Sequence, residues 1–381
     1  MEFQRRQRVV DAAEVWVVKI GSRSLTTADS RLDRAQIENI SGQLADLRAR
    51  GKQVVLVSSG AVASGVGRLG LAGRPKNLAT LQAVAAVGQA HLIQAYEECL
   101  TQRGHHAAQV LLTAADLDDR VGYLNVRNTL ASLHELGAIP IINENDTVAV
   151  DELKTTFGDN DRLAAMVTGL FARAILVILS DVHGLYDRDP ASPEARVLPL
   201  IEEVNRSVEE LVRDRKTGIS KGGMASKLQA ARFVTGTGQA VVIAWGREAK
   251  VLPRLADGEM LGSLFLPQAK TLTPKKRWVG FSAQCTGRLV VDDGAARAIH
   301  EQGSSLLAIG VRGVEGDFTK GDPVAVVDQR GQEIARGQIN YTAEEVRRIM
   351  GVKSDRIEEL LGECPYEEII HRDNLALSGL R

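Results

Sequence analysis

The chain has 381 residues, a length that accommodates two domains with hydrophobic cores of ordinary size. Hydrophobic residues make up 44% of the chain and charged residues 25%, and both fractions are typical of globular proteins. The net charge of −1 creates no overall field that would attract nucleic acid or an anionic membrane.

The cysteines and the N-terminal segment indicate a cytoplasmic location. Cys99, Cys285 and Cys364 are odd in number, far apart and without CxxC spacing, which argues against a disulfide framework or a zinc site. No apolar segment follows the N-terminal arginines as it would in a signal peptide, and no run of about 18 apolar residues could span a bilayer. We therefore expect a reducing compartment and no membrane partner.

The first predicted strand carries a lysine in an otherwise apolar run. Residues 15–20 read VWVVKI, and Gly21 and Ser22 follow. A buried parallel strand seldom contains a lysine unless the ammonium group reaches a ligand or a carboxylate. Lys19 is therefore a candidate for holding a phosphate. A lysine that extends into solvent from the end of the strand is the alternative.

A glycine-rich segment that matches a dinucleotide-binding motif follows the next two elements. A helix over 33–50 and a strand over 54–57 are followed by the small residues SSGA at 58–61. The segment GVGRLG at 65–70 then matches GxGxxG. We reject this motif because it does not directly follow the strand and because 71–96 contains no acidic residue to bind a ribose.

Two polar clusters lie at the ends of later elements. Before the first cluster, the hydrophobic periodicity predicts two helices and two strands, over 78–101, 118–136, 110–112 and 139–142. The strand over 139–142 runs into NEND at 143–146, and GDND at 158–161 begins a helix. Such residues are also common in turns and at helix N-caps. Because ligands bind at the carboxyl ends of strands in open α/β sheets, we favour a binding site, with the loop 147–157 as its lid.

A glycine-containing helix start is the next candidate. The strand over 174–179 ends in Ser180 and Asp181, and SKGGMASK at 220–227 leads into a helix. Free N–H groups at such a helix start, with Lys227 one turn later, would suit a phosphate. An ordinary glycine loop is the alternative. The chain has no GxxxxGK[ST] motif, so it is not a P-loop enzyme.

The order of elements predicts two domains. Strands and helices alternate up to the strand over 240–244, which predicts an α/β domain with a mainly parallel sheet covered on both faces. Two prolines and several basic residues mark 267–277 as an interdomain linker. Short strand-like runs between glycine-bearing turns then indicate a small β-barrel. We place the first domain at 14–266 and the second at 278–373.

These features together suit phosphoryl transfer to an amino acid. Lys19, Lys227 and the glycine-rich helix start would neutralise charge on phosphoryl oxygens, which is the main requirement of this reaction. No general base for a hydroxyl acceptor is evident, whereas a carboxylate is already ionised at pH 7, so a carboxylate acceptor and an acyl phosphate product are favoured. Acceptor oxygens in the clusters at 143–146 and 158–161 would stabilise an ammonium group.

In these motifs the chain resembles the glutamate 5-kinases, a branch of the amino acid kinase family that often carries a C-terminal PUA domain (pseudouridine synthase and archaeosine transglycosylase type). VVKIGS, SSGAVASG, INENDTVA, GDNDRLAA, SDVHGLYDRDP and GGMASKLQAA occur in the order and spacing of that family. The resemblance implies a three-layer αβα sandwich around an open, mainly parallel sheet, followed by a PUA β-barrel. It implies ATP-dependent phosphorylation of the side-chain carboxylate of L-glutamate, with Mg²⁺ on the ATP, as the first step of proline biosynthesis.

The resemblance also implies roles for individual residues. Lys19 and Lys227 would be catalytic, and Asp159 and Asp161 would orient these lysines or the substrate. The residues implied to hold glutamate are Ser59, Asp146 and Asn160. The residues implied to bind nucleotide are Lys19, Ser180, Asp181, Lys221, Gly222, Gly223, Met224, Ala225, Ser226 and Lys227. The family commonly has threonine where this chain has Lys221 and Ser226, so the role of Lys221 stays open.

Several partners and two other functions accompany this interpretation. The family is often inhibited by proline and is usually homo-oligomeric, and its labile product makes contact with glutamyl phosphate reductase attractive. An acetylglutamate, aspartate, carbamate or uridylate kinase would share the fold, but acetylglutamate has no ammonium group for the acidic clusters. An RNA-binding role of the PUA domain is the third interpretation. Residues 276–350 hold ten basic and ten acidic residues, whereas a phosphate-binding face is usually basic.

Overall fold

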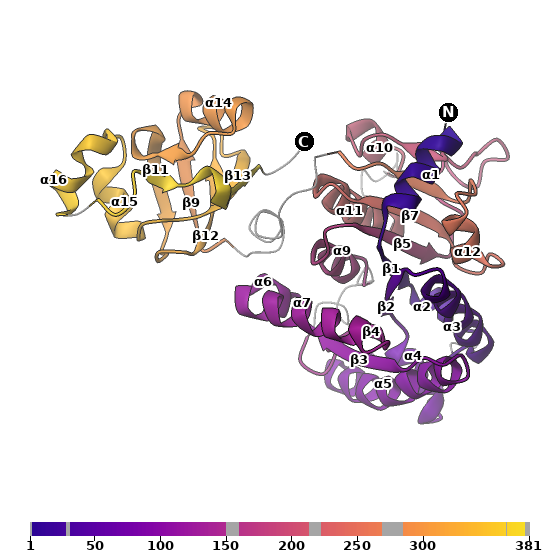
Figure 1. Ribbon diagram of the computed structural model, residues 1–381. Coiled ribbons are helices and arrows are strands. Elements are labelled where there is room, and N and C mark those ends of the chain that lie inside the picture. Colours follow the sequence, from indigo (N-terminus) through magenta and orange to yellow (C-terminus); the bar gives the residue numbers. More distant parts are fainter. Residues whose placement is uncertain are drawn as a thin grey trace. The chain divides into compact units, whose positions relative to one another are not determined.

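The computed structural model describes residues 2–27, 31–149, 160–212, 222–268, 285–362 and 364–377 (Figure 1). The chain forms two compact units, one built mainly from residues before 272 and the other mainly from residues after it. Most of the predicted linker lies outside the described residues, and the domain bounds stay predictions. None of the helices in the described ranges is long and apolar enough to cross a membrane.

An eight-stranded sheet with the order β3-β4-β2-β1-β5-β7-β8-β6 forms the centre of the first unit. Its strands are β1 (Val15–Ile20), β2 (Gln53–Ser58), β3 (Ala107–Leu112), β4 (Ile139–Glu144), β5 (Ala174–Ser180), β6 (Leu200–Ile201), β7 (Ala240–Trp245) and β8 (Ser263–Phe265). The neighbouring strands β3, β4, β2, β1, β5 and β7 are parallel to one another, and β8 is antiparallel to β7. The prediction of a mainly parallel sheet is confirmed.

Helices cover both faces of this sheet, which confirms the predicted three-layer sandwich (Figure 1). Helices α1 (Glu2–Ala12), α3 (Arg34–Ala49), α5 (Leu78–Thr101) and α12 (Val251–Ala256) share one hydrophobic core with the sheet. Helices α9 (Asp161–Gly169) and α11 (Gly222–Gly236) lie on the other face (Figure 1). The remaining helices of this unit are α2 (Ser22–Leu25), α4 (Ala61–Arg68), α6 (Ala114–Asp118), α7 (Arg120–Glu135) and α10 (Arg206–Glu210).

The alternation of side chains along β1 directs Lys19 toward α9. Trp16, Val18 and Ile20 are buried in the core with α3 and α5, so the intervening Lys19 points to the opposite face. The chain continues from β1 to β2 on one side, whereas β5 pairs with β1 on the other. The carboxyl end of β1 is therefore a topological switch point, the place where open α/β sheets bind ligands.

Two glycines bring α4 and α5 into backbone contact. A Cβ atom added at Gly65 would lie 1.9 Å from the backbone oxygen of Val84, and one at Gly88 would lie 1.8 Å from the backbone oxygen of Ala61. Gly65 is the first glycine of the GxGxxG run, which begins inside α4 rather than in a loop after a strand. The structure agrees with the rejection of that motif and gives Gly65 a packing role.

The second unit is rich in β-structure, as predicted. Its five-stranded sheet has the order β11-β9-β12-β13-β15, and β10 pairs with β14. The strands are β9 (Gly287–Val291), β10 (Leu306–Leu307), β11 (Val311–Gly316), β12 (Pro323–Val327), β13 (Glu333–Gln338), β14 (Glu368–Ile370) and β15 (Leu375–Leu377). Helices α14 (Asp293–Gln302), α15 (Ala343–Ile349) and α16 (Ile357–Leu361) accompany them, and a capping box of Thr342 and Glu345 begins α15.

Candidate active site

The buried carboxylate of Asp161 joins two lysines from different elements. Nζ of Lys19, on β1, lies 2.8 Å from Oδ1 of Asp161, and Nζ of Lys227, on α11, lies 3.2 Å from Oδ2. The side chains of Lys19 and Asp161 are fully buried, and that of Lys227 is 5% exposed. Because Asp161 begins α9, this shared carboxylate fixes two ammonium groups at the switch point of the sheet.

Two further contacts hold this cluster in place. The hydroxyl of Ser226 donates a hydrogen bond of 2.9 Å to Oδ2 of Asp161, the oxygen that also pairs with Lys227. The ammonium group of Lys227 also donates to the backbone oxygen of Gly223, one turn earlier in α11. The first turns of α11 are thereby tied to α9, and ammonium groups placed in this way suit a polyanion such as a nucleotide phosphate.

Asn160 connects the start of α9 with the ends of two strands. Its Nδ2 atom donates to the backbone oxygen of Ser58 at 3.0 Å, to Oγ of Ser59 at 3.2 Å and to Oδ1 of Asn143 at 2.8 Å. Although Asn160 is the N-cap residue of α9, its side chain makes no capping hydrogen bond. Asn160 thus occupies the N-cap position without capping the helix, and its amide group instead contacts the ends of β2 and β4.

Asp146 is a buried acid beside the end of β4. It is 8% exposed. Burial, together with the nearby charge of Glu144, raises the pKa of this carboxyl from 3.8 to about 6, while Arg74 opposes the change. A carboxylate kept from water in this way gains strongly from a bound cation, because a cation restores the stability that its charge loses on burial.

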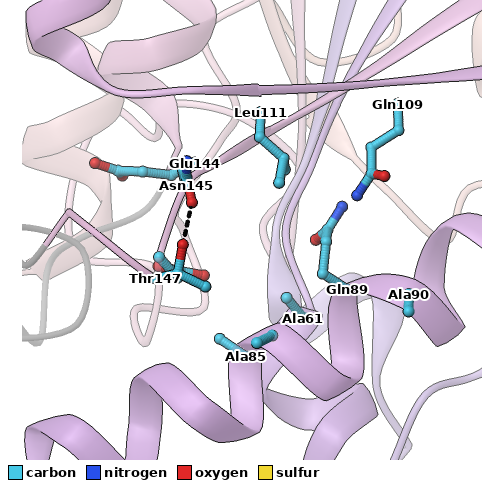
Figure 2. A pocket seen from close by; sticks show the side chains of 11 residues that line it. Ala61, Ala85, Gln89, Ala90, Gln109, Leu111, Glu144, Asn145 and Thr147 are labelled. Carbon is cyan, nitrogen blue, oxygen red and sulfur yellow. Dashed lines mark hydrogen bonds between the residues drawn. The ribbon is translucent and has the colours of Figure 1, made fainter.

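A cavity of about 210 Å³ opens next to Asp146 (Figure 2). Alanines of α4 and α5 line it together with Leu111, and Gln89, Gln109 and the residues 144–147 supply polar groups. The amide ends of Gln89 and Gln109 point toward each other, whereas the carboxylate of Glu144 points away from Gln89 (Figure 2). The cavity is smaller than the roughly 300–1,000 Å³ typical of drug-sized ligands and suits a small metabolite.

The expected nucleotide contacts lie on the other side of β1. Ser180 ends β5, and its hydroxyl donates to Asp181 at 3.1 Å. Burial opposes ionisation of Asp181, but the hydrogen bonds from Arg23 and Ser180 more than compensate and hold its pKa below the ordinary value. Arg23 pairs with Asp181 at 2.8 Å. The segment 222–226 occupies the beginning of α11.

Sequence reasoning missed several residues and named others that lie outside the described ranges. The residues that lie outside the described ranges are Asp159, Lys221 and residues 150–157 of the expected lid. The residues that sequence reasoning missed are Gln89 and Arg23. Asn143 was named only as part of the polar cluster 143–146 at the end of β4, without a role of its own, whereas Gln89 is a single amide in an alanine-rich helix and gave no signal.

Known proteins resemble this chain along almost its whole length. The model of the amino acid kinase family matches residues 14–244, and that of the PUA domain matches residues 287–361. Glutamate 5-kinase of Rhodopirellula baltica is 48% identical over 372 residues, which cover 98% of this chain and 96% of the relative. Glutamate 5-kinase of Methylococcus capsulatus is 49% identical over 363 residues, which cover 95% and 96%. A solved structure of carbamate kinase from Giardia lamblia bound to AMP-PNP is 17% identical, with a TM-score of 0.49, over 68% of this chain and 99% of that one.

Proposed function

The chain belongs to the amino acid kinase family and, within it, to the glutamate 5-kinases, and from this premise we propose how its residues perform the reaction. The enzyme uses ATP to phosphorylate the side-chain carboxylate of L-glutamate and forms L-glutamyl 5-phosphate, the first step of proline biosynthesis. The arrangement that supports the residue roles best is the buried carboxylate of Asp161 between Lys19 and Lys227.

The two lysines are proposed to stabilise the transferring phosphoryl group. A carboxylate oxygen of glutamate attacks the γ-phosphorus, the bond from this phosphorus to the bridging oxygen breaks, and ADP leaves with the electron pair. No proton must move, because the acceptor is already ionised. Lys19 and Lys227 neutralise charge on the phosphoryl oxygens, and Asp161 positions both ammonium groups for this role.

The glutamate is proposed to lie between these lysines and the cavity beside β4. Asp146 attracts its ammonium group, and Asn160 and Ser59 provide further polar contacts at the ends of α9 and β2. The reactive carboxylate then points toward Lys19, since Asn160 and Asp161 are consecutive residues. This orientation assigns the two polar clusters of the sequence to one substrate.

The ATP is proposed to occupy the side of β1 that faces β5 and α11. The helix start over 222–226 would receive phosphate oxygens, and Ser180 and Asp181 would contact the nucleotide beyond them. Lys221 and Asp159, which lie outside the described residues, are retained as proposed contacts. Mg²⁺ is proposed to arrive on the ATP, because kinases bind this ion largely through substrate phosphates.

A trapping assay tests the function directly. The enzyme is incubated with ATP, Mg²⁺ and one of L-glutamate, N-acetyl-L-glutamate, L-aspartate or carbamate, and hydroxylamine converts any acyl phosphate into a hydroxamate. Hydroxamate is expected from L-glutamate, whose ammonium group can pair with Asp146, and not from N-acetyl-L-glutamate, which has no ammonium group. Hydroxamate from acetylglutamate or aspartate, with none from glutamate, would refute the assignment.

The remaining expectations rest on family resemblance. We propose inhibition by proline, a homo-oligomeric assembly, hand-over of product to glutamyl phosphate reductase and a cytoplasmic location. The PUA domain is proposed to have a structural or regulatory role rather than an RNA-binding one, because its basic and acidic residues balance. Each of these stays a prediction.

A further inference from the structure

The hydrogen bonds around Asn143 fix which atom of Gln89 faces the cavity. The backbone N–H of Glu144 can only donate, and it donates to Oδ1 of Asn143 at 2.9 Å. The Nδ2 atom of Asn143 therefore becomes the donor on the other side, and it bonds Oε1 of Gln89 at 2.8 Å. With its oxygen occupied, Gln89 directs its Nε2 group, a pure donor, toward the remaining space.

This donor is buried and has no hydrogen-bond partner within the described part of the chain. Gln89 is 8% exposed, and its Nε2 atom makes no hydrogen bond to any group that the structure describes. Gln89 lines the cavity beside Asp146, and its amide end points toward the wall formed by Gln109 (Figure 2). A buried N–H group without an acceptor is costly, so an acceptor on a ligand would satisfy it.

The first turn of α4 adds a second feature that attracts negative charge. Ala61, the first residue of this helix, lines the same cavity. Gly60 precedes it as the N-cap residue in a left-handed conformation and, as a glycine, has no side chain to cap the helix. The N–H groups of a first turn have no partners within the helix and carry the positive end of its dipole. Gln89 and α4 therefore present donors to one part of the cavity.

Near these donors, the site also contains buried hydrogen-bond acceptors. The backbone oxygen of Ser58 can only accept, so Nδ2 of Asn160 faces it and Oδ1 of Asn160 is left as an acceptor. Both Oδ1 of Asn160 and Oδ1 of Asp146 are buried, and neither has a hydrogen-bond partner among the residues that the structure describes. The site thus separates a donor region from an acceptor region, as a zwitterion requires.

We propose that Gln89 binds the α-carboxylate of the substrate and thereby sets specificity for a free α-amino acid. Its Nε2 group donates to this carboxylate together with the first turn of α4, while Asp146 and Asn160 accept from the ammonium group. The proposal rests on the proposed function and deepens it, because it names a residue for the third group of glutamate. Gln89 makes no contact with the reacting carboxylate and is a specificity residue.

The test compares two phosphoryl acceptors in a variant that replaces the Nε2 donor of Gln89 by a hydrogen-bond acceptor. Gln89→Glu keeps the oxygen that accepts from Asn143 and replaces the Nε2 group by a carboxylate oxygen. L-Isoglutamine, whose α-carboxylate is a neutral amide, is compared with L-glutamate by kcat/KM, or by Ki where isoglutamine is not phosphorylated. We expect a loss on the order of 10- to 100-fold for glutamate and a clearly smaller loss for isoglutamine. Gln94→Glu, the same change on the exposed face of α5, is the matched control and is expected to keep both values.

Equal losses for the two acceptors, or no loss for either, would overturn the proposal, since a merely structural role moves both values alike. If Gln89→Glu does not fold, Gln89→Met, which also lacks the donor, takes its place with the same expected ratio. Absence of any acyl phosphate from L-glutamate in the unmodified enzyme would instead refute the proposed function. In that case calorimetric binding of L-glutamate and isoglutamine still tests Gln89 separately.

Discussion

The replacement Asp146→Asn should stabilise the protein and weaken its binding of glutamate. Asparagine has nearly the same shape as aspartate, so the cavity keeps its volume while the buried negative charge is removed. Burial and the charge of Glu144 raise the pKa of Asp146 from 3.8 to about 6. At 1.36 kcal/mol per pH unit, this corresponds to ~3 kcal/mol by which ionisation of Asp146 opposes folding at neutral pH.

The sign of this effect sets its pH dependence. Below about pH 4 the carboxyl is protonated in both folded and unfolded chains, so its ionisation costs no stability. As the pH rises from 3.8 toward 6, the unfolded chain releases the proton while the folded chain retains it, and folding becomes progressively less favourable. Above about pH 6 both states are ionised and the cost is constant. The stability gained by the variant should therefore be larger at pH 7.5 than at pH 5.

Thermal unfolding of the ligand-free enzyme and steady-state kinetics test this reasoning. Thermal unfolding at pH 7.5 and pH 5 measures the stability difference, with Asp46→Asn, an exposed aspartate on α3, as the control that should change little. Steady-state kinetics should show a rise in the KM for glutamate of about tenfold or more, because a charge-assisted hydrogen bond to the ammonium group is lost, with the KM for ATP unchanged.

Kinetics against pH add a third observation. In the unmodified enzyme, kcat/KM for glutamate should fall below about pH 6 as Asp146 becomes protonated, and this decrease should be absent in Asp146→Asn. A variant that unfolds at a lower temperature at pH 7.5 and keeps the glutamate KM would refute the argument. If the replacement raises only the KM for ATP, Asp146 belongs to the nucleotide-binding half of the site and not to the glutamate-binding half.

Three further replacements test the catalytic cluster, the helix contact and the second unit. Lys227→Met should lower kcat by orders of magnitude with an unchanged far-UV circular dichroism spectrum, and near-normal turnover would remove this lysine from the mechanism. Gly88→Ala should lower stability by roughly 3 kcal/mol or more, because the added Cβ would lie 1.8 Å from the backbone oxygen of Ala61. Gly67→Ala should cost little, because the added Cβ would lie 3.6 Å from the side chain of Arg31, and equal unfolding temperatures for the two alanine variants would contradict this explanation. Thr342→Ala removes the cap of α15 and should lower stability by about 1 kcal/mol in denaturant unfolding, whereas an unchanged midpoint would show that the capping box contributes little.

The sequence alone was sufficient where local pattern and chemistry agree. Lys19 was singled out because a charge interrupts an apolar strand, and the structure shows why the interruption is tolerated, since Asp161 meets it inside the protein. The polar cluster at the end of β4 and the start of α9 were singled out in the same way, and the structure joins them through Asn160 and Asn143. In both cases the unusual residue stands at the carboxyl end of a strand or at the start of a helix.

Local pattern failed where a residue acquires its role from distant partners. Gln89 has ordinary neighbours in an alanine-rich helix, and its partner Asn143 is 54 positions away. Helix α1 was not predicted either, because five of its eleven residues, Gln4–Arg8, are arginine or glutamine and leave little apolar periodicity to detect, and its anchoring depends on burial of Arg6 against the backbone of Leu261. Such contacts follow from the tertiary arrangement, and no propensity or spacing in the segment itself announces them.

The backbone contact between α4 and α5 limits how the pocket can change during evolution. Any side chain at Gly65 or Gly88 would collide with main-chain atoms of the other helix, so this wall of the cavity cannot be reshaped by small steps. The wall that carries Gln109 and Leu111 belongs to β3, an edge strand of the sheet, and both side chains are exposed. Acceptance of a new substrate would therefore arise more readily by substitution in this edge strand than by change in the helices.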